Sequence, residues 1–156
     1  MREAYLILHN IRSVHNVGAI FRTADAAGVE KIYLTGYTPT PLDRFGRERG
    51  DVAKTALGAQ KTIPWEQYKT LSPVIKKIKK EGFFLIAIEQ SKNAVDYKKV
   101  KVPNKVALLV GNEVRGLSKQ TLTQCDMVAE IPMKGEKESL NVSTALGIAL
   151  FRILNI

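Results

Sequence analysis

Apolar residues occur along this chain in short continuous runs, which alternate with longer stretches of helical periodicity. Runs of about five apolar residues are typical of strands that are buried on both faces of a sheet. These runs predict strands at residues 4–8, 31–35, 83–88, 106–110 and 127–131. The periodic stretches predict helices at residues 16–28, 73–80, 118–124 and 142–154, and a short one near 52–57.

The first helix is expected to begin at Asn16, a favoured capping residue, and to end at Gly28. Residues 36–64 are rich in Gly, Pro and Arg and are expected to be otherwise irregular. Strands that alternate with helices predict one α/β domain over residues 1–156, with a mostly parallel sheet and helices on both faces. In such folds ligands bind beyond the carboxyl ends of the strands.

The charge balance is strongly basic, since 24 Lys and Arg face 15 Asp and Glu and give a formal net charge of +9. Such a field favours a polyanion as partner, which could be RNA, DNA or an acidic lipid surface. A surface that is charged for solubility alone explains the same composition.

Cysteine and histidine are scarce. The single cysteine, Cys125, excludes an internal disulfide and a cysteine-based metal cluster, and it fits a reduced cytoplasmic compartment. His9 and His15 have too few suitable neighbours to act as metal ligands, so no metal is expected. Only five apolar residues in a row precede His9, too few for a signal core or a membrane span, and no membrane partner is expected.

Three polar constellations fall at predicted strand ends. In the first, Asn16 opens a helix and Arg22 follows six residues later, beside a run of apolar residues. An arginine in such surroundings needs a partner for its guanidinium. A structural salt bridge, for instance to Asp25 or Glu113, is the favoured explanation when this segment is considered alone.

The other two constellations lie closer to the C-terminus. Gly111 lets backbone approach a ligand and Glu113 brings a carboxylate to a strand end, although an ordinary tight turn with Gly116 as a hinge fits equally. Residues 131–146 join a strand end to a polar loop and then to a helix that starts at Asn141. Backbone N–H groups at such a junction can face a ligand, and plain loop and capping chemistry is the alternative.

Together these segments read N-x5-R, GNE-x-x-G and IPM-x-G-x3-SLNVS-x-A, in that order. The pattern resembles the SpoU or TrmH family of the SPOUT class, whose members methylate RNA ribose 2′-hydroxyls with S-adenosylmethionine. The resemblance covers residues 4–154. It implies a C-terminal trefoil knot, a homodimer and this cofactor. No P-loop, G-x-G-x-x-G, metal-spaced His pair or G-x-S-x-G motif supports another enzyme class.

The resemblance also implies a cofactor site made of apolar walls and main-chain groups. Carried over position by position, its residues are Ile88, Gly111, Ile131, Ser139 and Leu140.

The catalytic set implied by the resemblance is Arg22, Asn16, Glu113 and Asn141. The family assigns its arginine the role of base, but a guanidinium strongly resists deprotonation. We therefore expect Arg22 to bind an adjacent phosphate and orient the hydroxyl. Asn16 and Asn141 would fix Arg22 and the ribose, and Glu113 would orient the arginine or the loop.

RNA contacts are expected at residues 43–54, where Arg44, Arg47 and Arg49 surround Phe45. Cations beside an aromatic ring suit phosphate contact and base stacking, while a solvated flexible loop is the alternative.

The terminal helix is apolar on more than one face, so burial within one chain explains one face and a homodimer explains the rest. Transfer RNA is the preferred substrate by analogy with small family members, and ribosomal RNA is the alternative. A non-catalytic RNA-binding module, or a cofactor-binding structural protein, remains as another class.

Overall fold

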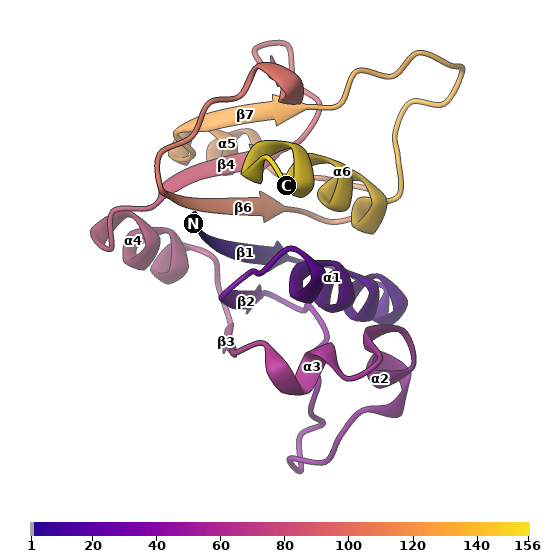
Figure 1. The fold of residues 1–156 in the computed structure, drawn as a ribbon. Coiled ribbons are helices and arrows are strands. Elements are labelled where there is room, and N and C mark those ends of the chain that lie inside the picture. Colours follow the sequence, from indigo (N-terminus) through magenta and orange to yellow (C-terminus); the bar gives the residue numbers. More distant parts are fainter. Residues whose placement is uncertain (1) are drawn as a thin grey trace.

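The computed structural model describes residues 2–156 (Figure 1). Within these residues the chain forms one seven-stranded sheet with the order β3-β2-β1-β6-β4-β7-β5, and every pair of neighbouring strands is parallel. The strands are β1 (Glu3–His9), β2 (Lys31–Thr35), β3 (Trp65–Tyr68), β4 (Phe84–Ile88), β5 (Val95–Asp96), β6 (Lys105–Val110) and β7 (Met127–Glu130). The helices are α1 (Val14–Ala26), α2 (Gly50–Ala56), α3 (Ala59–Thr62), α4 (Ser72–Lys80), α5 (Lys119–Gln124) and α6 (Val142–Leu154), with a 3-10 turn at Tyr97–Lys99.

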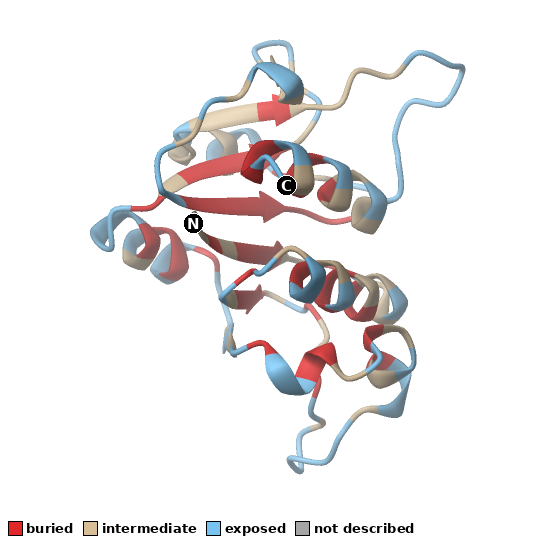
Figure 2. Ribbon diagram, viewed as in Figure 1, coloured by how far each residue is buried: buried red, intermediate tan, exposed pale blue. Residues whose placement is uncertain are grey.

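Helices cover both faces of the sheet, as the alternation of patterns predicts (Figure 1). One core cluster joins the sheet to α1, α2 and α6, and the other joins it to α4 and α5. The central strand β1 serves both, because Leu6 and Leu8 face the first cluster and Ile7 faces the second. Figure 2 shows this pattern, with buried strands in the middle and exposed outer helix faces.

The predicted start of the first helix is wrong. Helix α1 is capped by Ser13, whose Oγ accepts a hydrogen bond from the backbone N–H of Asn16 at 3.2 Å. Asn16 therefore lies in the first turn of the helix, and its side chain does not cap it. The end is close to the prediction, since α1 stops at Ala26 and Gly28 follows with φ of +71°.

The strands β3 and β5 were not predicted, and both are short. The segment at residues 36–64, expected to be mostly irregular, contains α2 and also α3.

Strand order decides how the site is built. β6 and β7 carry the second and third constellations, but they are not neighbours, because β4 lies between them. The end of β4 at Ile88 therefore sits between the Gly111 turn and the segment that follows β7. That segment runs outward from the sheet before it returns into α6, which packs on α1 (Figure 1). The threading of a knot stays a prediction.

Among residues 2–156, no helix combines the length and the apolar character that a bilayer span requires. The same part of the chain holds no cluster of three or more His, Cys, Asp or Glu that is arranged to hold a metal ion.

Candidate active site

A cavity of about 230 Å³ opens at the carboxyl edge of the sheet, between the ends of β4, β6 and β7 and the start of α6. Parallel sheets place ligand sites at this edge. The structure brings all the residues predicted to hold the cofactor to this cavity, namely Ile88, Gly111, Ile131, Ser139 and Leu140.

The turn after β6 forms one wall. A Cβ at Gly111 would lie 2.8 Å from the carbonyl carbon and oxygen of Gly116 and 2.7 Å from Cδ2 of Leu117, so only glycine fits. Asn112 folds this turn, because its Oδ1 accepts the backbone N–H groups of Val114 at 2.9 Å and Arg115 at 2.8 Å. Gly111 is thus required for the close packing of the turn and also lines the cavity.

Asn112 is a site residue that the sequence reasoning missed. It is 7% exposed, and its Nδ2 donates to the backbone oxygen of Asn10 and the hydroxyl of Tyr37, both at 3.0 Å. These bonds tie the wall of the cavity to the end of β1. The signal was available, since Asn112 is the middle residue of the GNE motif.

Glu113 ties the same turn to the start of α1. Its carboxylate accepts the backbone N–H groups of Arg12 at 2.9 Å and Ser13 at 3.0 Å, and Nδ2 of Asn16 at 3.0 Å. Burial opposes ionisation of Glu113, but these three donors outweigh it and lower the pKa of the carboxyl. Glu113 therefore orients the loop and the helix start.

Asn16 and Asn141 connect the first and last helices. Nδ2 of Asn141 donates to Oδ1 of Asn16 at 3.0 Å. Oδ1 of Asn141 caps α6 by accepting the backbone N–H groups of Ser143 at 2.9 Å and Thr144 at 3.3 Å. A chain of polar contacts thus runs from Glu113 through Asn16 to Asn141, and its two end members line the cavity.

Arg22 lies apart from this chain of contacts. It is exposed, and it lines a second cavity of about 590 Å³ between α1, α2 and α6, together with Lys54 and Phe151. The salt-bridge alternative is wrong for both candidates, because within residues 2–156 no ion pair joins Arg22 to Asp25 or to Glu113. Asp25 accepts the hydroxyl of Thr62 instead, and Glu113 is bonded as described. Within one chain Asn16 and Asn141 bond each other, so they do not fix Arg22.

The sequence of this chain is similar to a known family of RNA-modifying proteins. The model of the SpoU rRNA Methylase family matches residues 3–151. The chain belongs to this family. Curated relatives include 23S rRNA (guanosine-2′-O-)-methyltransferases RlmB of Neisseria meningitidis, 35% identical over 93% of this chain, and of Xanthomonas axonopodis, 36% identical over 96% of it.

Solved structures agree with this assignment. An AdoMet-bound rRNA methyltransferase from Sinorhizobium meliloti superposes with a TM-score of 0.89 at 31% identity over 98% of this chain. A TrmH/SpoU tRNA modifying enzyme of A. aeolicus gives 0.84 at 28% identity over 99% of it. The chain spans 55% and 57% of the two curated relatives, and 56% and 75% of the two solved chains. The mostly parallel α/β fold of this chain is therefore that of its SpoU neighbours, as the motifs predict.

The residues that line the cavity of this SpoU chain suit S-adenosylmethionine (AdoMet) in polarity and charge. Its apolar walls, from Ile88, Ile131 and Leu140, suit an adenine ring and a thioether chain. Two further carboxylates, of Glu89 and Glu130, also line it and suit the positive sulfonium and ammonium groups. Glu89 accepts the backbone N–H of Leu117 at 2.9 Å, whereas Glu130 makes no side-chain hydrogen bond or ion pair within residues 2–156.

The arginines predicted to contact RNA follow β2, away from the cavity. Arg44 and Arg47 lie against the ring of Phe45, but Arg49 turns to Asp51. Hydrogen bonds from the backbone of Phe45 and Arg47 to Asp43 shape this segment, and its role in RNA contact stays a prediction.

Proposed function

We propose that this chain transfers the methyl group of AdoMet to a ribose 2′-hydroxyl of RNA. The observation that carries the proposal is the single cavity that gathers every residue expected to hold the cofactor, with Glu113 and Asn141 beside it. The names of the relatives and the net charge of +9 support an RNA substrate.

Bound AdoMet supplies a methyl group that is already activated by its sulfonium. The protein must therefore align the ribose oxygen and allow one proton to leave. Alignment can lower the barrier by about 7–11 kcal/mol. A general base accelerates a reaction about a hundredfold to ten-thousandfold, which corresponds to about 3–5 kcal/mol. Alignment is the larger effect, and Arg22 is proposed to serve it by binding the neighbouring phosphate and orienting the hydroxyl, with the proton passing late to water.

Methyl transfer from isotopically labelled AdoMet to total RNA tests the proposal, and mapping of 2′-O-methylated positions identifies the product. Wild type should label RNA, and Asn141→Ala should lose most of the transfer, because Asn141 joins the cavity to α1. If the chain binds AdoMet and RNA but labels no RNA, it is a non-catalytic module.

Ribosomal RNA is proposed as the first substrate to test, because relatives at 35% and 36% identity are named 23S rRNA methyltransferases. Transfer RNA, the preference from sequence, is the second candidate and is favoured by the name of the A. aeolicus neighbour. Parallel reactions with purified 23S rRNA and with bulk tRNA separate the two. We place the reaction in the cytoplasm, where the half-buried thiol of Cys125 stays reduced.

A homodimer is proposed from the faces that one chain leaves uncovered. Helix α6 buries Leu146, Leu150 and Ile153 within the chain, but Ile148 remains 39% exposed and Leu57, beside the second cavity, is 65% exposed. A second copy would cover these residues. Light scattering should give a dimer mass, and a stable monomer would remove this proposal.

The dimer also explains why Arg22 stands outside the cavity of its own chain. Arg22 is proposed to act on the cofactor cavity of the partner subunit. Mixing of Arg22→Lys with Asn141→Ala subunits tests this arrangement, because a mixed dimer then holds one intact site. Random mixing should restore about a quarter of wild-type transfer. If the mixture stays as inactive as its two components, Arg22 does not act across the interface.

A further inference from the structure

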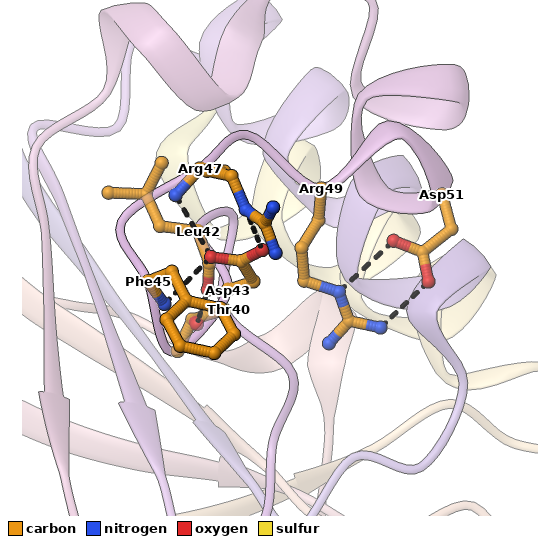
Figure 3. Close-up of polar contacts among 7 residues, drawn as sticks. All are labelled: Thr40, Leu42, Asp43, Phe45, Arg47, Arg49 and Asp51. Carbon is orange, nitrogen blue, oxygen red and sulfur yellow. Dashed lines mark hydrogen bonds and ion pairs between the residues drawn. The ribbon is translucent and has the colours of Figure 1, made fainter.

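The segment between β2 and α2 forms a hairpin whose tip is organised by one carboxylate (Figure 3). Leu42 and Glu48 pair in an antiparallel bridge at its base. Oδ1 of Asp43 accepts the backbone N–H groups of Phe45 at 2.8 Å and Arg47 at 3.0 Å, while Oδ2 accepts Nε of Arg47 at 3.0 Å. These bonds fix the tip before any ligand arrives, so little conformational entropy is lost on binding.

The tip presents an aromatic ring to solvent. Phe45 is 65% exposed, and it belongs to neither core cluster. The guanidinium carbons of Arg44 and Arg47 lie 4.7 Å and 5.0 Å from the centre of its ring. An exposed phenyl ring beside two cations matches an unpaired nucleotide, whose base stacks on the ring or on a guanidinium plane while its phosphates meet the charges.

Arg47 and Arg49 differ in what their charges do. Arg47 uses only Nε in its bond to Asp43, and its side chain is 72% exposed. Arg49 makes two hydrogen bonds to Asp51, at 3.1 Å and 2.7 Å, and its side chain is 33% exposed. Arg49 is thus held by the first turn of α2 and anchors the hairpin, whereas Arg47 can still reach a phosphate.

The hairpin leaves the sheet at β2, while β4, β6 and β7 border the cofactor cavity. β1 lies between β2 and β6, and the hairpin projects from the opposite end of the molecule to the loop that precedes α6 (Figure 1). Within one chain, a nucleotide held at the tip is therefore not the one that enters the cavity of that chain.

We propose that Arg44, Phe45 and Arg47, positioned by Asp43, bind an unpaired RNA nucleotide outside the cofactor cavity of their own chain. This site deepens the proposed function and rests on it for the identity of RNA as the ligand. It gives the enzyme a means of choosing a loop or a bulge over a continuous helix, because only an unpaired base offers its face for stacking.

Binding of two synthetic RNAs tests the proposal: a stem–loop with an unpaired adenosine loop, and a blunt duplex with the same stem. Phe45→Leu keeps an apolar side chain but removes the stacking plane. It should weaken stem–loop binding about tenfold and change duplex binding less than twofold, while Phe45→Tyr should bind like wild type. Ile156→Ala is a matched control, because Ile156 is 64% exposed at the other end of the chain and should change neither affinity.

The charge of Arg44 and the positioning of the tip by Asp43 can be tested by separate measurements. Arg44→Gln should weaken binding of both RNAs and reduce the slope of log affinity against log salt by about one. Asp43→Ala should imitate Phe45→Leu without lowering the melting temperature, because the hairpin lies outside the core, and Asp43→Asn should recover part of the affinity by accepting the two backbone N–H groups.

Two results would overturn the proposal: a wild-type chain that binds the duplex as tightly as the stem–loop, or a Phe45→Leu chain that binds the stem–loop like wild type. Both remain distinct from a failure of the proposed function. If wild type labels no RNA but Phe45→Leu still loses stem–loop affinity, the methyl-transfer proposal fails and the hairpin site stands. In an active enzyme Phe45→Leu should raise KM and leave kcat unchanged.

Discussion

Replacement of Glu113 by glutamine removes one negative charge from the contact between the Gly111 turn and helix α1. Oε1 of the new side chain can still accept from Ser13 and Asn16, as the carboxylate does at 3.0 Å in each case, and from the backbone N–H of Arg12 at the longer distance of 3.2 Å. Its amide nitrogen, however, would occupy the position of Oε2, which lies 2.9 Å from the backbone nitrogen of Arg12. Two donors would then face each other where the native chain has a charge-assisted bond.

The cost can be worked from these contacts. A hydrogen bond to a charged group contributes about 1.5–3 kcal/mol, and a neutral one about 0.5–1.5 kcal/mol. Glu113 is partly exposed, so solvent screens part of this difference, and we expect Glu113→Gln to lower the free energy of unfolding by about 1–2 kcal/mol. For a domain of this size that is a fall in melting temperature of about 2–8 °C. AdoMet affinity should fall as well, because the turn borders the cavity.

The effect should depend on pH. Burial opposes the charge on Glu113, but the donors from Arg12, Ser13 and Asn16 lower the pKa of the carboxyl below its ordinary value of 4.5. A lowered folded-state pKa stabilises the protein above the unfolded pKa, and this stability is lost as the pH falls through the folded pKa. The difference between wild type and Glu113→Gln should therefore be complete at neutral pH and shrink below about pH 4.5.

Thermal denaturation followed by circular dichroism measures this difference. Glu136→Gln is the matched control, since Glu136 is exposed and makes no side-chain hydrogen bond within residues 2–156; its melting temperature should equal that of wild type. Equal melting temperatures for wild type and Glu113→Gln at neutral pH would refute the reasoning. So would a gap that stays constant down to about pH 3.

Three further changes have defined outcomes. Arg22→Lys keeps the positive charge but loses the planar, forked guanidinium. Single-turnover methyl transfer should therefore fall about 10–100-fold, while the calorimetric Kd for AdoMet stays unchanged. Transfer near the wild-type rate would contradict the orienting role of Arg22. Gly111→Ala forces the turn to shift and should cost about 1–3 kcal/mol in urea unfolding and weaken AdoMet binding, and a fully stable variant would contradict the close packing. Hydrogen bonds, first from Lys31 and also from Lys77, lower the pKa of Glu66 to about 2. Glu66→Gln should therefore destabilise the chain by roughly 1 kcal/mol at neutral pH, and the difference in stability between wild type and variant should disappear as the pH falls from 4.5 towards 2. A difference of equal size in acid would contradict this stabilising role of Glu66.

The strands that sequence predicts are those with a continuous apolar run. β1, β2, β4, β6 and β7 lie inside the sheet, and all of them except β7 bury most of their residues. β3 reads WEQY, occupies the edge and is only partly buried, and β5 has two residues. Such edge strands form because a neighbouring strand offers free backbone groups, which no local pattern encodes.

The residues that the motifs predict to hold the cofactor all line one cavity, but the motifs did not predict the partners that connect them. Glu113 and the start of α1 are about a hundred residues apart, and their contact exists only in the folded chain. Ser13 and Asn16 are both good capping residues, so local preference alone could not choose between them. The expectation that Asn16 fixes Arg22 was wrong, because six residues advance a helix by about 9 Å and leave the two side chains about 120° apart around its axis.

The order of strands in the sheet has a consequence for synthesis of the chain. β1 is made first, yet one of its two neighbours, β6, begins only at Lys105. After β3 is complete, roughly 40 more residues must leave the ribosome, which takes about 2–8 s at ordinary rates of translation. Throughout that interval the apolar edge formed by Leu6, Ile7 and Leu8 has no strand to pair with, so the nascent chain is open to aggregation and to capture by chaperones until its second half arrives.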